Sequence, residues 1–109
     1  MGAGRRDKLI TIERATLTQD DYGAETPSWS TFVTEWAEVR FGNSGERREA
    51  AQEQAMVSAT FAVLDNLKTR AVAPKDRIQF DGGAWNIQSN VTARQPGERE
   101  ITAVRDAQP

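Results

Sequence analysis

A tight turn between two alternating segments constrains the fold of this chain more than any other local feature. Ile78 and Phe80 alternate with polar residues before Asp81-Gly82-Gly83, and Trp85 and Ile87 alternate with polar residues after it. Alternation with a period of two is typical of half-buried strands, and glycine adopts positive φ without steric cost. The sequence therefore predicts an antiparallel hairpin at this point.

The rest of the chain carries four further strand patterns separated by polar or proline-containing connections. The second of them is long enough to span ~40 Å at about 3.3 Å per residue, so we expect it to bend around a small barrel. Its alternation places Val33, Ala37 and Val39 on one face and Trp36 on the other. The four predicted strands are Lys8–Ala15, Ser30–Phe41, Val57–Leu64 and Glu98–Arg105, and the polar stretch Asp65–Asp76 is expected to be a plain connection.

One segment between the second and third predicted strands differs from the rest. Glu46–Met56 is rich in helix-forming residues and has no β-branched residue. Asn43 is a candidate N-cap, but the segment has only alanines and Met56 to bury, and Glu49 and Glu53 repel mildly. A helix this short is marginal in water by itself. It is therefore either a frayed surface helix or a segment that a partner orders.

Together these patterns predict one all-β domain over residues 1–109, with flexible ends at 1–7 and 106–109. The fold class is a small antiparallel six-stranded β-barrel or sandwich with a short helical insertion between strands 2 and 3. The apolar positions of the strands form the predicted core, which comprises Ile10, Ile12, Trp36, Val39, Phe61, Ile78, Phe80, Trp85, Ile87 and Ile101.

Composition excludes several classes of function. The chain has no cysteine and no histidine, so it offers no disulfide, no thiolate nucleophile, no zinc finger and no serine triad. The net charge of −2 gives no electrostatic basis for tight binding to DNA or to acidic membranes. Asp20 and Asp21 are more typical of a turn than of a metal site. We expect no catalytic residues, no metal, no cofactor and no membrane contact.

Two other classes stay open from the residues alone. The tryptophans and Phe61 are able to stack on bases, as in oligonucleotide-binding barrels, although their alternating context favours core packing. An enzyme that uses only carboxylates would require two acids to converge in a pocket. Exposed aromatic residues beside basic ones would favour the first alternative, and paired acids would favour the second.

The order of several short motifs resembles one family over about Leu9 to Arg105. The motifs are Leu9-Ile10-Thr11-Ile12, Asp20-Asp21-Tyr22-Gly23 with Trp29, Trp36-Ala37-Glu38-Val39, Gly45 with its charged stretch, Thr60-Phe61, Asp76-Arg77-Ile78, the Asp81-Gly82-Gly83 turn, and Trp85-Asn86-Ile87 with Val91. In this order they resemble the bacteriophage head–tail joining proteins, also called head-closure or stopper proteins. Arg40-Phe41 departs from the proline-containing strand end that is usual there.

The resemblance implies a non-enzymatic structural subunit that forms a ring, sixfold or twelvefold, with further copies of itself. The ring lies below the portal and adaptor and above a tail or tail-terminator protein, and double-stranded DNA passes through it without specific binding. The subunit is made in the host cytoplasm and becomes part of the neck of a phage or gene transfer particle. The loop between the second and third strands, within Gly42–Ala55, is then the channel or assembly loop. Its expected residues are Gly42, Asn43, Ser44, Gly45, Glu46, Arg47, Arg48, Glu49 and Glu53.

Overall fold

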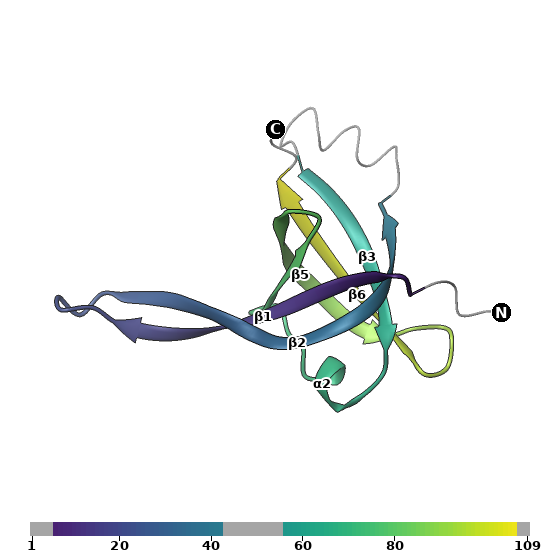
Figure 1. Cartoon of the computed structure of the whole chain (residues 1–109), viewed down its shortest axis with the longest axis horizontal. Helices are drawn as coiled ribbons and strands as arrows, with labels where there is room; N and C mark the ends of the chain where they lie inside the picture. Colours follow the sequence, from purple (N-terminus) through teal and green to yellow (C-terminus); the bar gives the residue numbers. More distant parts are fainter. Residues whose placement is uncertain (1–5, 43–55, 107–109) are drawn as a thin grey trace.

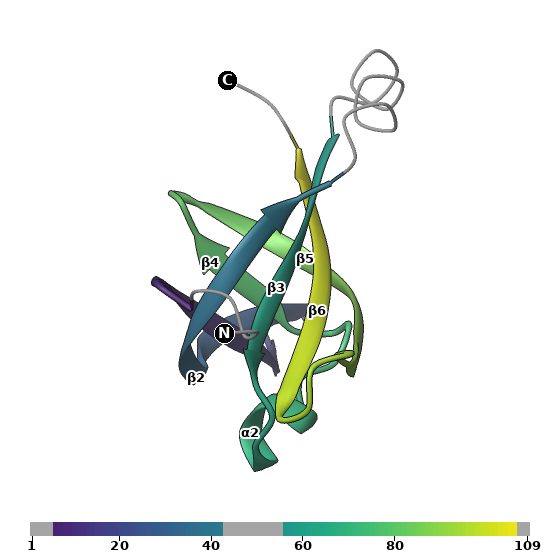
Figure 2. The ribbon, with the colours of Figure 1, turned by 90° about the vertical axis from the view of Figure 1, so that its right-hand side faces the viewer.

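A computed structural model describes residues 6–42 and 56–106 of the chain. All strand pairs are antiparallel, and the sheet closes into a barrel in the order β1-β2-β3-β6-β5-β4, as Figures 1 and 2 show. The predicted all-β fold class is confirmed. The elements are β1 Lys8–Gln19, β2 Glu25–Phe41, β3 Met56–Leu64, α2 Leu67–Arg70, β4 Arg77–Phe80, β5 Gly83–Thr92 and β6 Glu98–Asp106.

The helix of the described residues lies in the connection between β3 and β4, where the sequence predicted no helix. Asn66 caps it: the Asn66 side chain accepts from the Thr69 backbone N–H at 2.8 Å, and the Thr69 hydroxyl accepts from the Asn66 N–H at 2.9 Å. This reciprocal capping satisfies two backbone donors and stabilises a single turn. The helix predicted at Glu46–Met56 lies outside the described residues except for Met56, which begins β3.

The barrel interior is filled by inward-facing side chains from all six strands. Phe61 is at its centre, with its ring 5.5 Å from Trp85 and 5.7 Å from Phe80, both in edge-to-face geometry. The indole N–H of Trp85 donates to the Phe80 carbonyl at 3.2 Å, so this buried polar group is satisfied. The predicted core residues that the structure buries are Ile10, Ile12, Phe61, Ile78, Trp85, Ile87 and Ile101, and Val39 and Phe80 pack against them while partly buried.

The placement of Trp36 in the core is wrong. Its side chain is 54% exposed and lies beside Leu9, its cross-strand partner, which is 52% exposed. Ala37 is fully buried and Val39 packs on the core. Successive side chains of a strand point to opposite faces, so Trp36 has to point outward.

The turn between β4 and β5 has the geometry that the sequence predicts. Asp81 has φ 56° and Gly82 has φ 75°, and Phe80 pairs with Gly83 across the turn. Positive φ at both central residues matches a type I′ turn, whose twist fits that of the flanking strands. The turn therefore fixes the register in which Ile78 meets Trp85.

The β1–β2 hairpin extends well beyond the barrel. Both strands are longer than predicted, and they stay paired from Lys8↔Ala37 to Gln19↔Glu25. The pairing of β1 with β4 ends at Glu13, and beyond it the hairpin projects as a two-stranded ribbon, as Figure 1 shows. The molecule accordingly measures 54 × 38 × 21 Å. Alternation fades beyond Ala15 because both faces of this ribbon meet solvent.

Candidate assembly surfaces

The projecting hairpin, Ala15–Trp29, is the first surface and is called the arm below. Its tip is a turn that Asp20 organises: the Asp20 carboxylate accepts from the backbone N–H groups of Tyr22 at 2.8 Å and Ala24 at 2.9 Å. Gly23 supplies the positive φ, 85°. The predicted turn-forming role of Asp20 is confirmed. In the residues that the structure describes, no three acidic side chains gather as metal ligands would.

The tip combines exposed apolar side chains with charge of one sign. Tyr22 is 94% exposed and Leu17 is 61% exposed. Asp20, Asp21 and Glu25 are the charged residues of the arm, and all three are exposed. The arm therefore presents an acidic tip with an aromatic side chain at its end.

The root of the arm is fixed to the barrel by arginines that stack on aromatic rings. The Arg77 guanidinium lies 4.0 Å from the Trp29 ring centroid and donates to Glu13 at 2.7 Å. The Arg14 guanidinium lies 3.9 Å from the Phe32 ring centroid. These cation–π contacts cover the faces of two partly buried aromatic rings and hold the direction of the arm.

The buried carboxylate of Asp76 fixes the root of the arm by binding Arg14. It is 2% exposed and accepts two hydrogen bonds from Arg14, at 2.9 and 3.0 Å, and one from the Ala73 N–H at 2.9 Å. Burial alone would raise the pKa of Asp76. The hydrogen bonds from Arg14 and Ala73, with the positive charges of Arg14 and Lys75, outweigh burial and lower that pKa below its ordinary value. The carboxylate is therefore a charged structural anchor.

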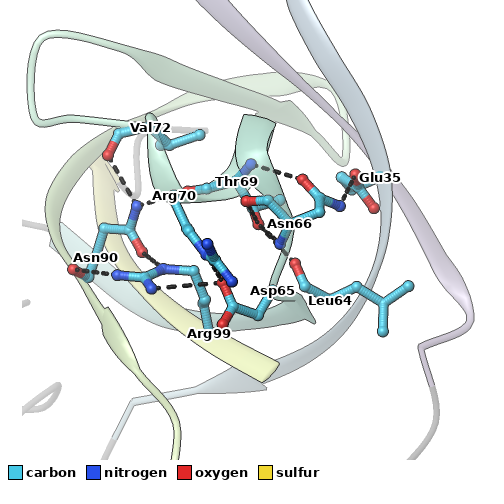
Figure 3. A network of polar contacts seen from close by, with 9 residues as sticks. All are labelled: Glu35, Leu64, Asp65, Asn66, Thr69, Arg70, Val72, Asn90 and Arg99. Carbon is cyan, nitrogen blue, oxygen red and sulfur yellow. Dashed lines mark hydrogen bonds and ion pairs between the residues drawn. The ribbon is translucent and has the colours of Figure 1, made fainter. Parts of the chain in front are cut away.

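A second surface lies at the end of the barrel that carries α2. Figure 3 shows the polar contacts beneath it. Asn90 donates to the carbonyls of Thr69 and Val72, both at 2.8 Å, and accepts from Arg99 at 2.9 Å. The Thr69 hydroxyl donates to the Leu64 carbonyl at 2.6 Å. These bonds tie α2 to β3 and β5, so a helix of one turn becomes a fixed part of the barrel.

Asp65 links this end to the last strand. It accepts from Arg70 at 2.8 Å and lies 3.6 Å from Arg99. The hydrogen bond from Arg70 and the charges of both arginines lower the pKa of Asp65, against a smaller opposing effect of desolvation. The Asp65 N–H also donates to the Gly97 carbonyl at 2.9 Å, which joins the β5–β6 turn to the α2 connection.

The third surface is the opposite rim, where β2 ends and β3 begins, as Figure 2 shows. Phe41 is 55% exposed there, with its ring 6.3 Å from Trp85. The Gly42 N–H donates to the Ser58 carbonyl at 2.8 Å, and a Cβ at Gly42 would collide with the Ser58 hydroxyl. Of the predicted channel-loop residues, Gly42 is described; Asn43, Ser44, Gly45, Glu46, Arg47, Arg48, Glu49 and Glu53 lie outside the described residues.

The sequence predicted an assembly loop at the third surface, and that loop lies outside the described residues except for Gly42. The sequence did not indicate the other two surfaces. The polar connection at Asp20–Pro27 was expected, but nothing in it indicated that both strands extend to the tip. The sequence Asn66-Leu67-Lys68-Thr69 carries the spacing of a capping pair, and this was the signal available for α2. Within the described residues no buried side-chain nitrogen or oxygen lacks a hydrogen-bond partner, so these polar clusters satisfy one another.

Comparison with known proteins agrees with this architecture. A solution structure of protein SF1141 from Shigella flexneri 2a superposes with a TM-score of 0.67 at 22% identity, covering 100% of both chains. A chain in the virion of a native gene transfer agent particle gives a TM-score of 0.65 at 22% identity, covering 90% of this chain and 92% of that one. No curated protein sequence matches the chain. The sequence profile of the phage head completion proteins matches residues 1–106, so the chain belongs to that family.

Proposed function

We propose that this structural protein of the phage head is a head–tail connector subunit of the stopper or head-closure type. It forms a ring with further copies of itself below the portal or adaptor and joins the capsid to the tail. The observation that carries the proposal is the family match over residues 1–106, on a barrel whose β2–β3 connection leaves from one rim. In such a ring the segment 43–55 faces the axial channel and helps to retain DNA.

The rim supports this role for the segment. Gly42 sits tightly against Ser58, and β3 pairs with β6 from Met56 onward, so both ends of the segment leave from fixed backbone. A loop anchored in this way is inserted at little cost to the barrel, because loop length adds slowly to the entropy of folding. The DNA passes without being held tightly, since the chain carries a net charge of −2. Assembly takes place in the host cytoplasm, before the particle is complete.

An oligonucleotide-binding barrel is the second candidate, and one observation favours it. Trp36 is exposed, and Trp29 and Phe32 lie beside basic residues. However, Arg77 and Arg14 already cover the rings of Trp29 and Phe32. Glu35 precedes Trp36, and Glu38 follows it two positions later, on the same face of the strand; both acids repel phosphate. The hypothesis of an enzyme that uses only carboxylates has less support, because the buried Asp76 and the partly buried Asp65 are each paired with arginine.

Deleting Glu46–Glu53 in a strain that produces the particles tests the proposed channel role. We expect the isolated subunit to keep its thermal melting curve, and the particles to lose DNA or fail to attach tails. DNA retention is measured as nuclease-protected DNA per head, and tail attachment by electron microscopy. The matched control replaces the same eight residues by a Gly/Ser segment of equal length.

The outcomes separate the parts of the proposal. A deletion that unfolds the isolated subunit would place the segment in the fold and contradict its role as a channel loop. A folded variant that gives particles with normal DNA content and infectivity would contradict the channel role. Removal of the whole protein without any loss of tailed particles would contradict the connector function itself.

A further inference from the structure

The arm and the α2 end of the barrel carry opposite charge, and both expose apolar side chains. Leu64 and Leu67 are 46% and 82% exposed, and the exposed Lys68 and Arg70 follow them in the chain. These four residues are called the receiving surface below. The exposed charged residues of segments 64–76 and 91–98 are all basic; they are Lys68, Arg70, Lys75 and Arg94. Among the acids of these segments, Asp76 and Glu98 are paired with Arg14 and Arg6, and Asp65 is paired with Arg70 itself. Glu35 also reaches this end of the barrel, where it accepts from the Asn66 side chain at 3.0 Å.

We infer that the arm tip of one subunit docks on the receiving surface of a second copy of the chain. Tyr22 would pack against Leu64 and Leu67, and Asp21 and Glu25 would face Lys68 and Arg70. The inference rests on the proposed ring, for which it names the contact between neighbours. Tyrosine and arginine are enriched among the residues that dominate binding energy at interfaces, and complementary charge fixes the orientation of the partner.

The two surfaces cannot meet within one molecule. The tip lies eight residues beyond Arg14 along a strand, or roughly 25 Å at about 3.3 Å per residue. The root of the arm is fixed beside α2, because Arg14 and Lys68 both lie over the Phe32 ring, at 3.9 and 4.8 Å. Figure 1 shows the arm leading away from the barrel. The tip therefore reaches outward to a neighbour.

The form of the contact suits a closed ring. The arm and the receiving surface are different patches, so the contact is heterologous, and such contacts generate rings when the rotation between subunits closes. The arm is also an isolated two-stranded ribbon, which is marginally stable in water without packing. Leu17, Tyr22 and Pro27 are exposed in the free subunit, and docking would bury them. Nucleic acid does not fit the tip, because Asp20, Asp21 and Glu25 repel phosphate.

Disulfide trapping tests the contact directly, because the chain has no cysteine of its own. Tyr22→Cys and Leu67→Cys variants are mixed at high concentration and low salt under mild oxidation. The mismatched control pairs Tyr22→Cys with Asn86→Cys, whose side chain is exposed on β5. We expect the Tyr22–Leu67 disulfide to form at least about tenfold faster than the control disulfide, since only the first pair is held together by docking.

Charge reversal provides a second, independent test of the contact. Lys68→Glu with Arg70→Glu should reduce the Tyr22–Leu67 disulfide about tenfold, because like charges that face each other across an interface are costly. Adding Asp21→Lys with Glu25→Lys to the Tyr22→Cys chain should restore it. The side chains of Asp21 and Glu25 make no hydrogen bond or ion pair with other described residues, whereas Arg70 donates to Asp65. Thermal melts therefore check that every variant is folded.

Equal rates for the Tyr22–Leu67 and Tyr22–Asn86 pairs would overturn the inference, and so would a rate that charge reversal leaves unchanged. If particles still require the protein in that case, the connector function stands and the ring uses other surfaces. If the disulfide forms as expected while particles assemble normally without the protein, the contact stands and the proposed function fails.

Discussion

At the scale of single residues, the fold depends on two different kinds of buried group. The aromatic cluster of Phe61, Phe80 and Trp85 fills the barrel and removes apolar surface from water. The pair of Arg14 and Asp76 instead satisfies a buried charge by two hydrogen bonds and leaves the arginine plane free to stack on Phe32. Substitutions in the aromatic cluster therefore test the contribution of apolar burial to stability, and substitutions at Asp76 test the contribution of the buried ion pair.

Phe61→Ala or Trp85→Ala should each lower the free energy of unfolding by about 3–5 kcal/mol, because each removes a buried ring and leaves a cavity. Trp36→Ala is the matched control and should cost less than about 1 kcal/mol, since its side chain is 54% exposed. Denaturant melts followed by circular dichroism measure all three. Equal losses of unfolding free energy for the Trp36 and Trp85 variants would mean that the inward and outward faces of the barrel strands are wrongly assigned.

The Arg14–Asp76 pair should make stability depend on pH in acid. The folded-state pKa of Asp76 is lowered, so its contribution is fully present above the ordinary aspartate pKa of about 3.9 and is lost as pH falls through the folded value. Asp76→Asn should cost about 1–3 kcal/mol at neutral pH and should show a smaller further loss below pH ~4. Asp21→Asn, on the exposed tip, should match the wild-type profile; a variant at Asp76 that also matches it would contradict this role.

At the scale of elements, turn chemistry decides which strands pair in register. The β4–β5 turn needs positive φ at Asp81 and Gly82, and the pairing of Ile78 with Trp85 depends on it. At the tip of the arm, Asp20 and Gly23 do the same for the parts of β1 and β2 that pair only with each other. Local sequence therefore sets hairpins whether or not a core lies beneath them.

Gly82→Ala should lower the free energy of unfolding by about 1–2 kcal/mol, because an L-residue at φ 75° is strained. Gly83→Ala is the control: it has no positive φ, and its added Cβ would meet only the far end of the flexible Arg105 side chain. We expect the control to lose clearly less in the same denaturant melt. The reverse order would mean that side-chain crowding, rather than backbone conformation, limits the turn.

At the scale of the whole molecule, the charges are segregated although the net charge is only −2. The charged residues of the arm are all acidic, and the exposed charged residues of segments 64–76 and 91–98 are all basic. The two groups lie on different parts of an elongated subunit. In the proposed ring, this distribution of charge suits head-to-tail contacts between copies of the subunit better than tight contact with a polyanion. The same segregation predicts that assembly weakens as salt is raised.

Titration with duplex and single-stranded DNA at physiological salt should show no binding tighter than the non-specific range of roughly 10⁻⁴–10⁻⁶ M. We expect this weak binding to DNA to come from the basic residues of the α2 end, so Lys68→Glu should weaken it further. Trp36→Ala should leave it unchanged. Nanomolar binding to single strands that disappears in the Trp36 variant would favour the oligonucleotide-binding barrel.

The sequence by itself determined the all-β class, the β4–β5 turn and most of the core, because alternation and glycine φ preferences act over a few residues. The sequence also contained the signal that Trp36 is exposed, because the alternation of the strand places Trp36 on the face opposite to Ala37 and Val39. Only the tertiary structure decided how far the arm projects, because strands that pair without burying a face show no apolar alternation in the sequence. The contacts of Asp76 with Arg14 and of Asn90 with Arg99 and the α2 carbonyls also came from the tertiary structure alone. They join residues distant in the chain that barrel closure brings together.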